Sequence, residues 1–270
     1  MNFSYRWLGN AGFEFRFGKK ILMIDPFLTR PGRSCVYSGK VEPDARAIED
    51  HITKCDHILV SHTHFDHFMD VPGIARQTGA VIHGSRNTCH LAQAQGVPEN
   101  QTHLIHSGDD FKLDDIQIKV IPAAHSWIPG YSRGKLNGQT KPPLRLRDYR
   151  MDTNSSFLIS FQRQRILIWS STRTDGAVPA KVLICRAGYG RRWYERMVNT
   201  VRPRLVIPSH WDDMFRPLSE PPRPFFSPPR LAFPPIQRIN LGKFERKIKH
   251  TRPESEVLVP ERFKEDTIEI

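Results

Sequence analysis

The chain has 270 residues, of which 39% are hydrophobic, and its 40 Lys and Arg against 28 Asp and Glu give a net charge of +12. This length can bury a substantial core, whereas no apolar run approaches the roughly 20 residues of a membrane-spanning helix, which excludes a helical membrane protein. Four widely spaced cysteines exclude a disulfide framework, and the first residues lack a signal-peptide pattern, so we expect a cytoplasmic protein.

The first half of the chain reads as strands followed by strand–helix units. Aromatic residues alternate on both sides of the Gly9–Gly12 turn, which predicts a hairpin, and the apolar run 21–24 predicts a buried strand. We further expect helices near 43–50, 71–78 and 87–94, strands at 57–60 and 80–83, and a strand over 111–121 that pairs with one around 102–105.

The second half contains two segments of unusual composition. Residues 129–150 are rich in basic and turn-forming residues, so we interpret them as an inserted loop. Prolines crowd residues 216–236, which predicts an extended surface segment. Between these segments we expect strands at 157–161, 166–169 and 205–207 and a helix over 194–201.

The order of these elements predicts the architecture. Hairpins come first and strands then alternate with helices, which favours an α/β protein with helices outside a pair of sheets, in four layers ordered αββα. The chain has no internal repeat and no clean linker, so residues 1–270 are predicted to form a single domain.

Seven residues, Ser61-His62-Thr63-His64-Phe65-Asp66-His67, carry the strongest functional signal. Neutral imidazole is the commonest protein metal ligand and carboxylate oxygen complements it, so this cluster indicates a metal site rather than packing. The cluster follows the strand expected over 57–60. His125 and His210 also follow buried strands and could join it at one edge of the sheets, although surface histidines at strand ends would explain these two equally well.

The cluster resembles the HxHxDH signature of the metallo-β-lactamase fold superfamily. Residues 7–13 and 24–27 look like the opening of the branch that includes ascorbate-phosphate lactonase and related metal-dependent hydrolases, and 122–126 and 208–213 look like its later ligand motifs. The resemblance implies an αββα sandwich with a metal site at one edge. It places His62, His64 and His125 in a first metal site and Asp66, His67 and His210 in a second.

One departure from the family pattern concerns the ligand that bridges the two metals. The family usually supplies an Asp in a turn after a strand, and Ser171 stands at that place after the strand 166–169. Asp175 follows too far along the chain to be an evident substitute. Without an anionic bridge, less negative charge holds two divalent cations close together. We therefore predict one tightly bound metal and a weak or empty second position.

The predicted function is hydrolysis of a small ester, lactone or amide by a metal-activated water, which Asp66 would orient or deprotonate unless it binds a second metal. Zn²⁺ is the expected metal, with Mn²⁺ or Fe²⁺ as alternatives. Asp25 would accept a ring N–H from a ligand histidine, unless it is simply a turn residue. Arg145 and Arg147 of the inserted loop would bind an anionic group of the substrate, unless the loop is merely solvated.

Two other functions stay open. The net charge and the nucleases within the same superfamily favour a nuclease or phosphodiesterase, although the sequence contains no additional nucleic-acid-binding module. The departure at Ser171 favours a non-catalytic metal-binding protein derived from an enzyme. We therefore expect a small-molecule substrate, with nucleic acid as the less favoured partner and no membrane association.

Overall fold

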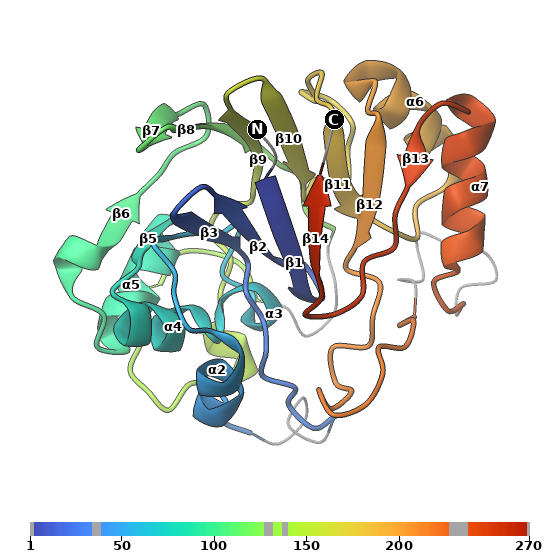
Figure 1. The fold of residues 1–270 in the computed structure, drawn as a ribbon. Coiled ribbons are helices and arrows are strands. Elements are labelled where there is room, and N and C mark those ends of the chain that lie inside the picture. Colours follow the sequence, from blue (N-terminus) through green and yellow to red (C-terminus); the bar gives the residue numbers. More distant parts are fainter. Residues whose placement is uncertain (1–2, 34–38, 127–131, 137–139, 227–236, 269–270) are drawn as a thin grey trace.

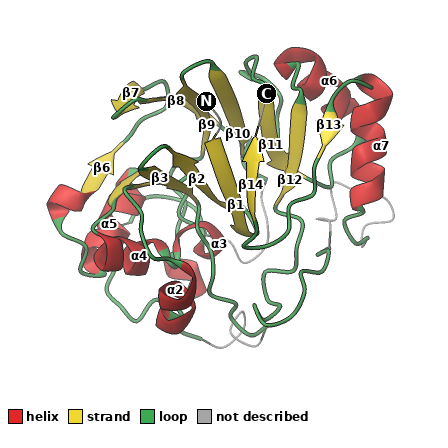
Figure 2. Cartoon of the chain, in the orientation of Figure 1, coloured by secondary structure: helices red, strands yellow, loops and turns green. Residues whose placement is uncertain are grey.

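Two facing sheets form the centre of the structure, a computed structural model that describes residues 3–33, 39–126, 132–136, 140–226 and 237–268. Each sheet has seven strands, and helices lie on the outer sides of the pair (Figures 1 and 2). The four-layer αββα sandwich expected from the sequence is confirmed.

The first sheet has the strand order β14-β1-β2-β3-β4-β5-β6. Its strands are β1 (Phe3–Gly9), β2 (Gly12–Phe17), β3 (Lys20–Ile24), β4 (His57–Leu59), β5 (Val81–Gly84), β6 (Thr102–Leu104) and β14 (Glu265–Ile268). Strands β14 and β1 to β3 pair antiparallel, which includes the expected hairpin, whereas β3 to β6 run parallel. The helices that connect them are α2 (Ala45–His51), α3 (Phe65–Phe68), α4 (Val71–Thr78), α5 (Arg86–Ala94) and the 3₁₀ helix η1 (Glu99–Gln101).

The second sheet has the strand order β13-β12-β11-β10-β9-β8-β7. Its strands are β7 (Asp110–Leu113), β8 (Ile116–Pro122), β9 (Ser155–Phe161), β10 (Gln164–Trp169), β11 (Val182–Arg186), β12 (Leu205–Ser209) and β13 (Glu256–Val257). Strands β7 to β10 pair antiparallel and β10 to β13 run parallel. Helices α6 (Arg191–Val201) and α7 (Leu241–Thr251) lie beside this sheet (Figure 1).

Successive residues of β3 face two different cores. Leu22 and Ile24 are buried in the core between the sheets, whereas Ile21 and Met23 are buried in a second core that includes Ile48 of α2. Side chains alternate across a strand, so an uninterrupted apolar run marks a strand that is covered on both faces. This pattern explains why the chain builds four layers instead of two.

The strand expected over 111–121 is interrupted by a turn. Asp114 has a φ of +52°, and the chain reverses there so that β7 and β8 form a local hairpin. Strand β6 pairs with β5 in the first sheet, so the expected pairing of 102–105 with this region is wrong. The turn gives β8 an adjacent partner in sequence, which leaves β6 to extend the parallel part of the first sheet.

The two segments of unusual composition are described in part. The inserted loop contains the 3₁₀ helix η2 (Leu146–Asp148), and residues 216–226 of the Pro-rich segment form no regular helix. Residues 129–131, 137–139 and 227–236 of these segments lie outside the described residues. Within the described part of the chain, no helix combines the length and apolar character needed to cross a membrane.

Candidate metal centre

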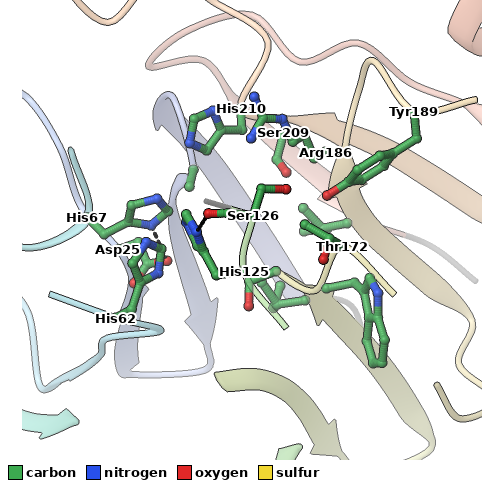
Figure 3. Close-up of a pocket in the computed structure, with 15 residues that line it drawn as sticks. Asp25, His62, His67, His125, Ser126, Thr172, Arg186, Tyr189, Ser209 and His210 are labelled. Atoms are coloured by element: carbon green, nitrogen blue, oxygen red, sulfur yellow. Dashed lines mark hydrogen bonds and ion pairs between the residues drawn. The ribbon is translucent and has the colours of Figure 1, made fainter. Parts of the chain in front are cut away.

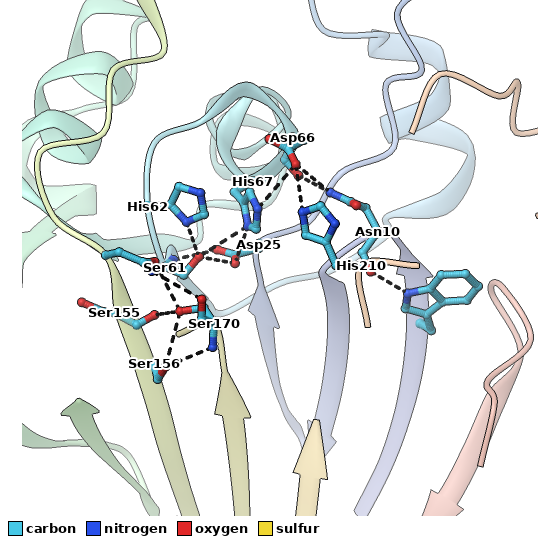
Figure 4. Close-up of polar contacts among 12 residues, drawn as sticks. Asn10, Asp25, Ser61, His62, Asp66, His67, Ser155, Ser156, Ser170 and His210 are labelled. Carbon is cyan, nitrogen blue, oxygen red and sulfur yellow. Dashed lines mark hydrogen bonds and ion pairs between the residues drawn. The ribbon is translucent and has the colours of Figure 1, made fainter. Parts of the chain in front are cut away.

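The histidine motif lies where β4 leaves the first sheet (Figure 4). Ser61, at the start of the motif, donates its backbone N–H to Asp25 Oδ1 at 2.7 Å and its hydroxyl to Asp25 Oδ2 at 2.5 Å. Asp25 directly follows β3, which is the parallel neighbour of β4. Because both strands end at the same edge of the sheet, this carboxylate anchors the loop that carries the histidines.

Two further histidines reach this edge from the second sheet. His125 follows β8, and the preceding Ala124 donates its backbone N–H to Ser171 Oγ at 3.0 Å. His210 follows β12 and donates its backbone N–H to the carbonyl oxygen of Asn10 at 2.8 Å. Both sheets therefore contribute imidazoles to one place, which is the first of the two interpretations that the sequence left open for His125 and His210.

The six predicted ligands form two adjoining groups. Figure 3 shows four of them, His62, His67, His125 and His210. Within each group, one ligand atom from every residue lies within 4.8 Å of the others. The first group is His62, His64 and His125, and the second is Asp66, His67 and His210. The rings of His62 and His67 are 4.0 Å apart between centroids, so the groups lie side by side. Surface histidines would not converge in this way, and the role of the six residues as metal ligands stays a prediction.

The donor atoms of both groups fit a divalent cation. His62 Nε2 and Asp66 Oδ1 are buried and have no hydrogen-bond partner among the described residues. His125 donates from Nδ1 to the carbonyl oxygen of Ser126 at 2.6 Å, which leaves its Nε2 lone pair available. Buried polar atoms without partners are costly, so these atoms call for a ligand that accepts their lone pairs.

Burial keeps the imidazoles of the first group neutral. It lowers the pKa of His62 well below its ordinary value, the pKa of His64 to about 3 and the pKa of His125 to about 4. A neutral imidazole presents a lone pair to a cation, whereas a protonated one repels it. The first group is therefore in the protonation state that metal binding requires.

In the second group, neighbouring groups of opposite charge determine the direction of the pKa shifts of Asp66 and His67. Burial opposes ionisation of Asp66, but His67 and His210 outweigh burial and lower the pKa of its carboxyl. Burial also lowers the pKa of His67, but Asp66 and Asp25 outweigh it, and the net shift is upward. Asp25 Oδ2 accepts the Nδ1 proton of His67 at 2.8 Å, which is the contact expected of this aspartate and directs His67 Nε2 toward Asp66.

Asn10 supports the second group and was not predicted from the sequence. Its Nδ2 donates to Asp66 Oδ2 at 3.2 Å and to the backbone oxygen of Asp66 at 3.1 Å, while its own carbonyl accepts from His210 N and from Trp7 Nε1 (Figure 4). Asp212 Oδ1 in turn accepts the backbone N–H of Asn10 at 2.7 Å. The only local signal was the Gly-Asn turn, in which Asn10 has a φ of +49°.

Ser171 holds the loop that carries His125. Its buried Oγ accepts the backbone N–H groups of Ala124 at 3.0 Å and Arg173 at 3.1 Å. The hydroxyl oxygen carries no net charge, and both of its hydrogen bonds are made to backbone N–H groups. Ser171 therefore offers no carboxylate that could bridge two metals.

A pocket opens beside the two groups and contains about 580 Å³ of space free of protein atoms, open solvent included. Histidines from both groups line one part of it, and Arg186 and Tyr189 line another (Figure 3). Neither of these two residues was predicted as part of the site, because Arg186 ends an ordinary apolar strand and Tyr189 follows in a glycine-containing turn. Their place in the pocket depends on the parallel pairing of β11 with β12.

The predicted substrate-binding arginines lie elsewhere on the inserted loop. Arg145 and Arg147 are exposed, and neither is among the described residues that line the pocket. Arg145 forms an isolated backbone bridge with Lys40, and its N–H donates to Asp148 Oδ2 at 2.7 Å. Their assignment to substrate binding stays a prediction.

A family model described as the beta-lactamase superfamily domain matches residues 21–171, which is more than half of the chain. The chain therefore belongs to this family, and the resemblance of the histidine cluster to the metallo-β-lactamase fold superfamily is confirmed.

Curated relatives are named UPF0173 metal-dependent hydrolases. One from Pyrobaculum arsenaticum is 36% identical over 130 residues, which cover 48% of this chain and 53% of the relative. One from Myxococcus xanthus is 32% identical over 121 residues, 44% of this chain and 38% of the relative. The chain spans about half the length of the curated relatives it matches.

Solved structures support the same fold. A metallo hydrolase from Ignicoccus hospitalis, Igni18, superposes with a TM-score of 0.67 at 18% identity, over 100% of both chains. At this level of identity the similarity establishes the architecture alone.

Proposed function

We propose that this chain is a metal-dependent hydrolase that cleaves a small ester, lactone or amide with a water molecule. The observation that carries the proposal is the convergence of two triads of ligand atoms, one from each of six residues, at a pocket that histidines of both triads line. The curated relatives, which are named metal-dependent hydrolases, support it.

The reaction would use residues of both groups. His62, His64 and His125 would hold a divalent cation, which would lower the pKa of a nearby water toward about 7 and polarise the substrate carbonyl. Asp66 presents its unpartnered Oδ1 as an acceptor for the proton of that water, while Asn10 fixes its other oxygen. Nitrogen and carboxylate donors suit Zn²⁺, Mn²⁺ and Fe²⁺, and Zn²⁺ is the metal we propose.

Removal of the metal tests this function. We expect a chelator to abolish hydrolysis and added Zn²⁺, Mn²⁺ or Fe²⁺ to restore it, because the side chains alone provide no comparable activation of water. Initial rates on ester, lactone, amide and phosphodiester panels, before and after chelation, measure this. Hydrolysis restricted to phosphodiesters would favour the nuclease instead, and no hydrolysis with any of the three metals would favour a non-catalytic protein.

The uncharged side chain of Ser171 leads to an expected number of bound metals. We expect about one metal ion per chain after extensive dialysis, because Ser171 supplies no charge to offset the repulsion between two cations, and no carboxylate among the described residues is placed between the two groups in its stead. Elemental analysis measures this, and the Ser171→Asp variant, which adds a carboxylate at that place, should retain more metal under the same dialysis. Two ions per chain in the unsubstituted protein would contradict the expectation.

A further inference from the structure

Arg186 faces the pocket from the end of β11. In the register of the parallel strands Arg186 pairs with Ser209, which directly precedes His210. The guanidinium therefore lies next to the second group of ligands and lines the same pocket as the histidines (Figure 3).

Within the described part of the chain, no carboxylate neutralises this guanidinium. Among the described residues, none of the acidic side chains lies within 4.0 Å of it, and its Nε is buried without a hydrogen-bond partner. The described pocket lining contains one carboxylate, Asp25, whose oxygens already accept from Ser61 and His67. Arg30, another arginine that lies close to this region, differs because Asp212 approaches it at 3.5 Å. A partly buried and unpaired positive charge beside a cation site favours a negatively charged ligand.

The backbone around Arg186 is held in place. The hydroxyl of Tyr194 donates to the carbonyl oxygen of Arg186 at 2.9 Å and accepts the N–H of Tyr189 at 3.2 Å. The ring of Tyr189 stacks on Trp193 with centroids 4.2 Å apart, and its hydroxyl points into the pocket (Figure 3). The guanidinium and a phenol are thus presented to the pocket on a fixed turn, which reduces the ordering cost of binding.

We propose that Arg186 binds a carboxylate or phosphoryl group of the substrate while the bond to be cleaved lies at the histidine groups. This proposal rests on the proposed hydrolase function and names its substrate class, small anionic molecules. A guanidinium grips either group through two parallel hydrogen bonds, and each bond is stronger because both partners are charged. The residue that selects the anion is then Arg186 of the sheet, in addition to or instead of the arginines of the inserted loop.

Two esters with the same leaving group test the selection in the metal-loaded protein. p-Nitrophenyl acetate is neutral, whereas mono-p-nitrophenyl succinate carries a carboxylate. We expect Arg186→Gln to lower kcat/KM for the succinate ester by about 10- to 100-fold, mainly through KM, and to change the acetate ester by less than about 3-fold. Arg186→Lys should recover part of the loss because it restores the charge without the two parallel bonds.

A matched control removes the same charge elsewhere. Arg163, exposed in the turn between β9 and β10, is replaced with Gln, and both esters should be hydrolysed as by the unsubstituted protein. An equal loss on both esters in Arg186→Gln, or an unchanged KM for the succinate ester, would overturn the proposal. Arg186→Lys serves as the test variant if Arg186→Gln does not fold.

Binding of inorganic phosphate separates this proposal from the hydrolase function. Titration calorimetry on metal-free and metal-loaded protein should give a Kd at least about 10-fold weaker for Arg186→Gln than for the unsubstituted chain or Arg163→Gln. Equal affinities, or no binding by the unsubstituted chain, would overturn the anion site. If neither ester is hydrolysed but phosphate binding depends on Arg186, the anion site stands and the proposed hydrolysis of such esters fails.

Discussion

His67→Ala is expected to lower metal-dependent hydrolysis by more than about 100-fold. His67 is one of three donors in the second group, and its ring links Asp66 to Asp25. Loss of a residue that merely orients a ligand typically costs 10- to 100-fold in affinity or activity. The loss of His67 should cost more because it also leaves Asp66, the proposed acceptor of the proton from water, without this imidazole partner. Initial rates at saturating metal, together with elemental analysis, measure the effect.

His83→Ala provides the matched control for His67→Ala. His83 is also buried, and its Nε2 lies 3.2 Å from His57 Nδ1 while its ring stacks on Phe111. Both variants remove a buried, hydrogen-bonded imidazole, so each should lower the free energy of unfolding by about 1–3 kcal/mol. Only His67→Ala should lose activity. Equal residual activity in the two variants would remove His67 from the site.

Asp25→Ala is expected to lower both stability and metal affinity. The carboxylate is 2% exposed and accepts hydrogen bonds from Ser61 N, Ser61 Oγ and His67 Nδ1. Its removal leaves these donors buried without an acceptor, which should cost about 3–5 kcal/mol in the free energy of unfolding. The loop that carries His62 and His64 loses its anchor at Ser61 as well, so the Kd for Zn²⁺ should rise about 10- to 100-fold. Denaturant unfolding and metal titration measure the two effects separately.

Asp70→Ala separates the two effects of Asp25→Ala. Asp70 is another buried carboxylate with three hydrogen bonds, from the backbone of Leu28 and Thr29 and from the Thr29 hydroxyl, but it belongs to neither ligand group. The Asp70→Ala substitution should lower the free energy of unfolding by a similar amount and leave the Kd for Zn²⁺ unchanged. A similar rise in Kd in both variants would mean that Asp25 acts only through stability. Asp25→Asn, which keeps the size of the side chain, is measured if Asp25→Ala does not fold.

Local sequence patterns were sufficient to predict the layers of the fold. The apolar run of β3 indicates a strand covered on both faces. The histidines directly after buried strands left convergence at one edge as one of two open interpretations, and the family resemblance favoured it. Local sequence patterns were insufficient to predict the partner of β6. Pairing between distant strands depends on the whole sheet and not on the residues of either strand alone. The turn at Asp114 was the local feature that would have separated β7 from β8.

The supporting residues of the site were harder to predict than the ligands. Asn10 reaches Asp66 across 56 positions of the chain, and Arg186 reaches the pocket through its register with β12. Neither residue type is unusual in a turn or at a strand end, so composition and spacing give no signal for them. The exposed basic loop with Arg145 and Arg147 offered a visible charge pattern, whereas the arginine that lines the pocket is a single residue at the end of an apolar strand.

The first group of ligands takes His62 and His64 from one sheet and His125 from the other. Metal binding to this group is therefore linked thermodynamically to the packing of the two sheets against each other. If the sheets separate, the three ligand atoms no longer lie close enough to bind one cation. A cation at 1,000 times its Kd would add about 4 kcal/mol to the free energy of unfolding. Metal supply would then set how long the folded chain survives as well as how fast it turns over substrate.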